Sequence, residues 1–287
     1  MMQLLKQTFE ERRSDEVGVY AAAVAYYAIF SLAPMLIIVI AVLTFFGRGD
    51  AQVAILEQIQ SVAGQDAAQL VRSMIENRQA AGGNILATLV GLGLVLVGAT
   101  GVMAQLQKAL NIIWNVKLEP ERSGLRHMLR VRAMSLLLII GVGLLLVAAR
   151  VGTAILRSLA AVVREEVPQI GLLWTVLDPL ILIVVSGLVF SVVFKYLPDV
   201  RIAWRTVVVG GLVTAVGFAM GNWLLSLYLS WGAVTSVYGA AGALVAILLW
   251  VFVSSHILLL GAEFTKVYAR HTGDRIVPDA HAVPRHR

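Results

Sequence analysis

The stretch Leu172–Phe194, with the sequence LLWTVLDPLILIVVSGLVFSVVF, decides the fold class of this chain. Its only charged residue is Asp178. A helix needs about 20 predominantly apolar residues to cross the hydrocarbon core of a bilayer, which is about 30 Å thick. The stretch is long enough and apolar enough for that, so it predicts a membrane-spanning helix.

The composition of the whole chain also indicates a membrane protein. Apolar residue types make up 59% of the 287 residues and charged types 14%, whereas soluble domains average about 45–50% and about 25%. The mean hydropathy is +0.84. These values exclude a disordered chain, which is poor in apolar residues, and an ordinary soluble globule. The absence of cysteine excludes disulfides, iron–sulfur clusters and zinc sites with cysteine ligands.

Six segments share these properties, and we interpret them as transmembrane helices. They lie at about residues 18–46, 85–106, 133–151, 172–194, 207–229 and 238–264. Long continuous apolar runs favour helices over a β-barrel, whose strands alternate in polarity over about ten residues. The expected fold is all-α and polytopic, with short extracytoplasmic helices after the first span. Its predicted parts are a cytoplasmic amphipathic segment at 1–16, a transmembrane domain at 17–268 and a disordered cytoplasmic tail at 269–287.

The basic residues are distributed unevenly between the two sides of this topology. Of the 23 lysines and arginines, 17 fall in the N-terminal segment, the C-terminal segment and the connections after the second and fourth spans. The other 6 fall on the opposite side. Because cytoplasmic loops carry the excess of Lys and Arg, this split predicts that both termini are cytoplasmic.

Three groups of short motifs follow one another along the chain. They are AAVAYYAIFSLAP at Ala22–Pro34, then Lys195-Tyr196-Leu197-Pro198 with Trp204-Arg205 and Gly210-Gly211, and finally Tyr238-Gly239, Leu249-Trp250 and Gly261-Ala262-Glu263. In this order they resemble the BrkB/YihY family of bacterial inner-membrane proteins, once labelled ribonuclease BN. The resemblance implies six spans in the bacterial inner membrane. Family labels include a virulence factor and a ribonuclease, and later proposals favour envelope lipid handling or transport.

The residues themselves argue against an enzyme. Metal-dependent RNA hydrolysis needs several histidines and carboxylates that converge on ions, and the five histidines are scattered without a ligand motif. No Gly-x-Ser-x-Gly motif indicates a serine hydrolase. No phosphate-binding loop indicates an ATPase. We therefore expect no catalytic residues, no metal, no cofactor and no nucleic-acid partner.

Charged residues inside spans are the first candidates for a site, because a charge at mid-bilayer costs about 2.5–3.5 kcal/mol or more. Arg150 and Asp178 lie near the outer ends of the third and fourth spans. They are interpreted as a charged gate or headgroup contact, or alternatively as a structural ion pair or an arginine whose side chain extends to the membrane interface.

Glu263 lies near the inner end of the sixth span. The pattern leaves two roles open for it, a proton site and a structural pin between helix ends. The basic residues expected at the same depth form an inner-end charge cluster of Lys195, Arg201 and Arg205. His256 precedes Glu263 by seven residues and shares its helix face, so the two form a polar track or His256 binds a backbone carbonyl.

Two further features lie in the first and fifth spans. The first contains Tyr26, Tyr27 and Ser31 and then Pro34, which predicts a kink. Broken helices can line transport sites, although kinks also serve packing. In the fifth span, Gly217 and Gly221 form a G-x-x-x-G motif that is typical of close helix packing.

Together these features favour a protein that binds or moves an amphipathic envelope molecule such as a lipid. Membrane lipids are the expected partners, and homo-oligomer formation is left open. The alternative is a membrane scaffold that binds a partner and transports nothing. In that case the polar residues only hold helices together.

Overall fold

The computed structural model describes part of the chain, and every structural statement below concerns that part. The described residues are 4, 6–8, 10–11, 15–29, 69, 72, 101–118, 137, 141, 144–145, 148, 152–153, 170–230, 242–279 and 282–284.

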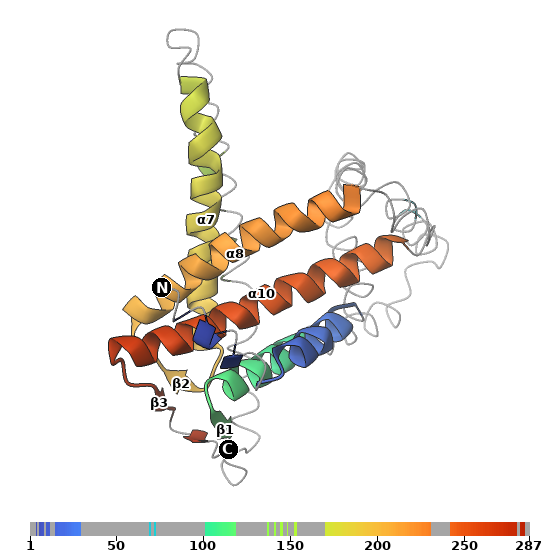
Figure 1. Ribbon diagram of the computed structural model, residues 1–287. Helices are drawn as coiled ribbons and strands as arrows, with labels where there is room; N and C mark the ends of the chain where they lie inside the picture. The colour runs from blue at the N-terminus through green and yellow to red at the C-terminus, as the bar shows by residue number, and fades with distance from the viewer. Residues whose placement is uncertain are drawn as a thin grey trace. The chain divides into compact units, whose positions relative to one another are not determined.

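Long apolar helices dominate the described residues (Figure 1). They are α7 (Ile170–Tyr196), α8 (Trp204–Ser230) and α10 (Gly242–Thr272). By length and composition, each contains a stretch that can cross a membrane, namely Pro179–Tyr196, Trp204–Leu229 and Val245–Thr272. These stretches coincide with the predicted fourth, fifth and sixth spans. The prediction of a mainly helical protein with several apolar spanning helices is therefore confirmed at this level.

The first three predicted spans are described only in part. A shorter apolar helix, Val17–Ile29, forms the start of the predicted first span. A helix over 101–113 includes the end of the predicted second span. Most of the third span, and most of the connection at 47–84, lie outside the described residues. The count of six spans therefore stays a prediction.

The chain divides into two compact units. One comprises Met1–Gly18, Leu106–Gly221 and His256–Arg287, and the other comprises Val19–Gln105 and Asn222–Ser255. The candidate site described below lies wholly in the first unit, which we call the inner unit because it contains the predicted cytoplasmic ends of the last three spans.

Small residues bring the three long helices of the inner unit into close contact. A Cβ at Gly210 of α8 would overlap the Thr265 side chain of α10, and a Cβ at Gly261 of α10 would overlap Thr214 of α8. A Cβ at Gly187 of α7 would lie 2.7 Å from Leu212 of α8. Glycine at these positions lets neighbouring backbones approach, which is how helices associate in membranes.

The sequence behind these contacts is a repeated Gly-x-x-x-Ser/Thr pattern, one copy on each helix. Each hydroxyl donates a hydrogen bond to the carbonyl of the glycine one turn earlier. The donor–acceptor pairs are Ser191 to Gly187 (2.6 Å), Thr214 to Gly210 (2.7 Å) and Thr265 to Gly261 (2.6 Å). The hydroxyls are thereby satisfied within their own helices, so they can be buried at the crossings without cost from an unpaired polar group.

Two short antiparallel strand pairs connect loops of the inner unit. Strand β1 (Val116–Leu118) pairs with β4 (Ala282–Pro284), and β2 (Val200–Arg201) pairs with β3 (Val277–Pro278). The sequence predicted a disordered tail at 269–287, and the structure differs. Helix α10 continues to Thr272, and the tail then supplies one strand to each of two loops. The tail sequence does not reveal this because the partner strands lie far away in the chain.

Candidate functional site

The inner unit contains a buried cluster of charged side chains around Lys266 of α10. Its Nζ lies 2.9 Å from Oε2 of Glu263, 2.9 Å from Oδ2 of Asp15 and 2.6 Å from Oε2 of Glu11. The ammonium group thus contacts three carboxylates at once. We call these four residues the Lys266 cluster.

The cluster forms because α10 and the N-terminal segment pack against each other. Glu263 and Lys266 are three residues apart on α10, so they share one face of the helix. Asp15 and Glu11 come from the other end of the chain, and the Asp15 amide donates to the Glu11 carbonyl at 3.0 Å. An apolar contact beside them includes Leu4, Phe264 and Val267, which are all buried.

The side chains of the cluster are almost completely withdrawn from solvent. The exposed fraction is 0% for Glu263, 1% for Lys266 and 5% for Asp15, and it rises to 23% for Glu11. Glu11 has a second cationic partner, since Nη1 of Arg270 lies 2.6 Å from its Oε1. In the described contacts, the three carboxylates therefore share two cationic partners, Lys266 and Arg270.

The Glu263 carboxyl differs from the other two in its surroundings. Its Oε2 is within ion-pair distance of Lys266. Its Oε1 is buried and accepts no hydrogen bond from any residue that the structure describes. An ionised carboxylate with a bare buried oxygen is expensive, because burial removes the water that would otherwise solvate it.

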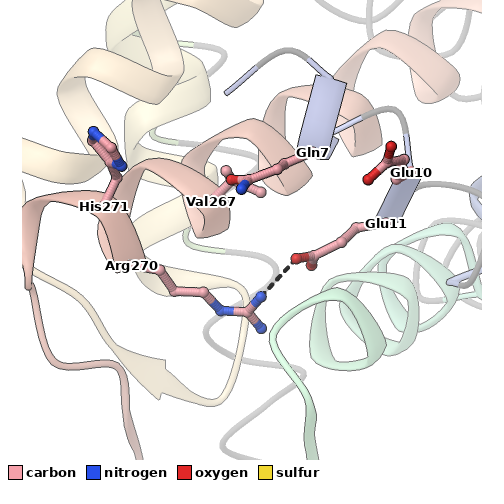
Figure 2. A pocket seen from close by; sticks show the side chains of 6 residues that line it. All are labelled: Gln7, Glu10, Glu11, Val267, Arg270 and His271. Atoms are coloured by element: carbon pink, nitrogen blue, oxygen red, sulfur yellow. Dashed lines mark hydrogen bonds and ion pairs between the residues drawn. The ribbon is translucent and has the colours of Figure 1, made fainter. Parts of the chain in front are cut away.

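A cavity of about 400 Å³ opens beside the cluster (Figure 2). Its lining comes from the N-terminal segment and the end of α10, and it consists of Gln7, Glu10, Glu11, Val267, Arg270 and His271. Figure 2 shows the Arg270 guanidinium extended towards Glu11 across the space between the two segments. Glu11 belongs to both the cavity wall and the cluster, so the cavity reaches the edge of the cluster.

The three carboxylates are also a donor set that suits a hard metal ion. Oxygen atoms of Glu11, Asp15 and Glu263 lie within 4.8 Å of one another, and oxygen ligands are those that Mg²⁺ and Ca²⁺ prefer. The ammonium of Lys266, however, lies within 2.9 Å of each carboxylate. A metal ion would have to displace this cation, so the geometry favours a lysine-centred cluster over a metal centre.

A second polar network in the inner unit is centred on Asp199, which follows α7. Its Oδ2 accepts hydrogen bonds from Nδ2 of Asn111 at 2.7 Å and Nε2 of Gln107 at 3.2 Å. Its backbone amide donates to Oδ1 of Asn111 at 2.9 Å. This network attaches the loop after α7 to the helix over 101–113, which includes the end of the second predicted span.

The three residues of the predicted inner-end charge cluster, Lys195, Arg201 and Arg205, have different surroundings from one another in the structure. Nζ of Lys195 donates to the carbonyl of Ile202 and lies 5.8 Å from the centre of the Trp204 ring. Arg201 forms an exposed ion pair with Asp279 at 3.0 Å, and Arg205 is exposed. The structure places Glu263 next to Lys266 of its own helix, which the sequence interpretation did not name.

The structure describes some of the other predicted site residues and not others. In the second unit, the Tyr26 and Tyr27 rings meet edge to face with centroids 5.9 Å apart. His256 lies opposite Gly18, where a Cβ would approach its Cε1 to 3.9 Å. At Gly217 a Cβ would meet Ile257 at 3.5 Å, which is an ordinary contact. The residues that lie outside the description are Ser31, Pro34, Arg150 and the side chain of Asp178.

The sequence interpretation missed Glu11, Asp15 and Lys266. Two local signals were present, since Glu11 and Asp15 are four residues apart and Glu263 and Lys266 three apart, which are spacings that place side chains on one helix face. No signal in a single sequence indicates that the two pairs meet.

Comparison with known proteins places this chain among membrane proteins of one family. The model for the family described as virulence factor BrkB matches residues 8–286, which is nearly the whole chain. The chain belongs to the BrkB family. This confirms the resemblance that the three groups of motifs indicated.

Several proteins similar to this chain are named as UPF0761 membrane proteins. The chain is 28% identical over 263 residues to one from Ralstonia nicotianae, covering 89% of this chain and 57% of the relative. It is 28% identical over 245 residues to one from Nitrosospira multiformis, covering 84% and 55%. It is 28% identical over 278 residues to one from Photobacterium profundum, covering 92% and 82%.

The chain therefore spans little more than half the length of the first two relatives. No solved structure matches it. The family membership shows a membrane protein with bacterial relatives and assigns no specific activity.

Proposed function

We propose that this BrkB-family protein binds or moves an amphipathic envelope molecule such as a lipid. In this proposal it crosses the bacterial inner membrane six times, with both termini in the cytoplasm. It acts without its own ATPase, metal or cofactor, and it is not an enzyme. Its partners are membrane lipids rather than nucleic acid. The proposal leaves open whether copies of the chain form a homo-oligomer.

The observation that supports the proposal is the cavity at the end of α10. Its walls carry both signs of charge, with Arg270 and His271 on α10 and Glu10 and Glu11 on the N-terminal segment. An arginine is well suited to bind phosphate, because its guanidinium forms paired, charge-assisted hydrogen bonds. A lipid headgroup that contains a phosphate and an amine would find partners for both groups here. The location fits as well, because the cavity adjoins the end of a candidate membrane span.

Native mass spectrometry of the purified protein tests the proposal. The wild type is compared with Arg270→Ala, and with Arg275→Ala as a matched control, since Arg275 is an exposed arginine nearby that does not line the cavity. We expect the wild type and Arg275→Ala to retain one selected phospholipid class and Arg270→Ala to lose it. Equal, unselective lipid adducts on all three folded proteins would contradict lipid binding in this cavity.

The scaffold alternative draws on a different observation. Every carboxylate of the Lys266 cluster has the Lys266 ammonium as an ion-pair partner, as expected of side chains that only join two segments. A scaffold predicts that Glu263→Gln and Arg270→Ala change thermal stability and leave lipid retention as in the wild type. Lipid binding predicts that Arg270→Ala keeps its stability and loses the lipid.

A further inference from the structure

We propose that the turn from α7 into α8 binds the headgroup of an anionic phospholipid at the membrane surface. The surface concerned is formed by Lys195, Tyr196, Trp204 and Arg205, and we call it the α7–α8 corner. It is separate from the cavity at the end of α10, so it goes beyond the lipid binding proposed there. It rests on the proposed function only in placing these helix ends at a membrane surface.

The corner lies where two candidate membrane spans meet. The stretch Pro179–Tyr196 ends at the tyrosine, and the stretch Trp204–Leu229 begins at the tryptophan. Because the two spans follow each other in the chain, these two ends lie on the same side of any membrane that both helices cross. Tyrosine and tryptophan are enriched at membrane–water interfaces, since each has an apolar ring and a polar group at its edge.

The two aromatic rings form one exposed surface with the lysine. Tyr196 and Trp204 are 45% and 47% exposed, and their rings meet edge to face with centroids 6.0 Å apart. Nζ of Lys195 lies 5.8 Å from the centre of the Trp204 ring and donates to the carbonyl of Ile202. An ammonium group has three donors, so this hydrogen bond holds it beside the rings and leaves two donors for a ligand.

The exposed charges of the corner are positive. Arg205 is exposed and forms no ion pair with any residue that the structure describes. Arg201, in the link between the two helices, is exposed and pairs with Asp279. The acidic residue of the link, Asp199, is engaged elsewhere, because its Oδ2 accepts hydrogen bonds from two amide side chains of the helix over 101–113. The corner therefore attracts anions.

This combination of groups suits a phospholipid with a net negative headgroup. The Arg205 guanidinium can form paired, charge-assisted hydrogen bonds to a phosphate, and basic residues at the ends of membrane helices attract anionic lipids. A free phosphate would leave the two exposed rings unused, whereas a lipid places its glycerol and upper acyl chains beside them. The cavity at the end of α10 has walls of both signs, so the corner differs from it in selecting net negative charge.

Native mass spectrometry of the purified full-length protein, titrated separately with phosphatidylglycerol and phosphatidylethanolamine, tests the proposal. We expect the wild type to bind the anionic phosphatidylglycerol more tightly than the neutral phosphatidylethanolamine. Arg205→Ala should bind phosphatidylglycerol about fivefold more weakly, which corresponds to about 1 kcal/mol per basic residue at an anionic surface. Arg275→Ala, at another exposed arginine, is the matched control and should bind as the wild type does. Equal affinities of the wild type for the two lipids, or unchanged phosphatidylglycerol affinity in Arg205→Ala, would overturn the proposal.

A second pair of variants tests whether the ligand is a lipid or a free anion. Trp204→Ala removes an exposed ring from the corner, and Trp223→Ala removes one elsewhere on α8. We expect weaker binding of phosphatidylglycerol only in Trp204→Ala. Glycerophosphoglycerol, the same headgroup without acyl chains, should not displace the lipid at equal concentration. Displacement by this headgroup, or equal lipid binding by the two variants, would contradict a lipid at the corner.

The corner and the cavity fail separately in this experiment. Weaker binding in Arg205→Ala supports the corner even if Arg270→Ala retains all its lipid, a result that would contradict the cavity. Loss of lipid confined to Arg270→Ala would support the cavity and overturn the corner. Since Trp204 and Arg205 are exposed, their variants should fold. The wild-type preference between the two lipids tests the proposal without any variant.

Discussion

Gly210 of α8 and Thr265 of α10 lie so close that a Cβ at position 210 would overlap the threonine side chain. The same relationship recurs one turn away in the opposite sense, where Gly261 of α10 meets Thr214 of α8. The two helices therefore cross antiparallel, with a glycine of each helix against a threonine of the other. Their separation is set by these four residues, and on α10 the Lys266 cluster overlaps them, since Glu263 lies between Gly261 and Thr265.

Replacing Gly210 by alanine should therefore destabilise the protein. The added methyl group has no free space, and overpacking of a tight contact costs about 1–3 kcal/mol. We expect a clear fall in the thermal unfolding midpoint of Gly210→Ala in detergent, measured by loss of the monodisperse peak on size-exclusion chromatography after heating. Gly217→Ala is the control in the same helix, because its Cβ would meet Ile257 at an ordinary 3.5 Å. Equal midpoints for the two variants would contradict close packing at Gly210.

Lys266 should be far more sensitive to substitution than Glu263. Lys266→Met leaves three carboxylates without their shared ammonium, and removal of one partner of a buried ion pair costs about 3–5 kcal/mol. Glu263→Gln keeps the shape of the side chain and leaves Lys266 paired with Glu11 and Asp15, so we expect a loss of no more than about 1 kcal/mol. Thermal unfolding of both variants gives the comparison.

A surface ion pair provides the control for the Lys266 experiment. Arg201 and Asp279 form a pair whose side chains are 72% and 36% exposed, and such pairs contribute about 0–1 kcal/mol. Arg201→Ala should therefore unfold close to the wild-type temperature. A Lys266→Met variant that is as stable as Arg201→Ala would show that the buried cluster does not hold the N-terminal segment on α10.

The Asp199 network should contribute to the stability of the inner unit. Asp199→Ala removes the acceptor for two amide groups, and Asn111 is buried. A buried donor left without an acceptor costs about 1–3 kcal/mol. Gln107→Ala removes only the longer bond, of 3.2 Å, and should cost less. If thermal unfolding ranks the two variants in the reverse order, the network is not centred on Asp199.

Hydropathy located the long helices correctly, since the fourth, fifth and sixth predicted spans overlap α7, α8 and α10. A run of some twenty apolar residues is a local property, so one sequence suffices to find it. The same reasoning singled out Glu263, because a carboxylate inside an apolar run is costly and must be accommodated.

The partners of Glu263 could not be found in this way. Basic residues of the link between α7 and α8 were expected beside it, and the structure provides Lys266 from one turn away and Asp15 from the other end of the chain. The closest helix contacts likewise involve glycines paired with Ser or Thr, such as Gly261 and Thr265, whereas the sequence drew attention to Gly217 and Gly221. Which small residues touch depends on how helices cross, and a single sequence does not contain that information.

The predicted topology can be tested directly, because the chain contains no cysteine and each introduced cysteine is then a unique label. Arg48→Cys lies between the first two predicted spans, and Arg275→Cys lies beyond α10. With six spans and both termini cytoplasmic, a membrane-impermeant thiol reagent applied to intact spheroplasts should label Arg48→Cys. It should label Arg275→Cys only after the membrane is permeabilised. Labelling of Arg275→Cys in intact spheroplasts would contradict the predicted orientation and would place the C-terminus, the cavity and the Lys266 cluster on the outer side.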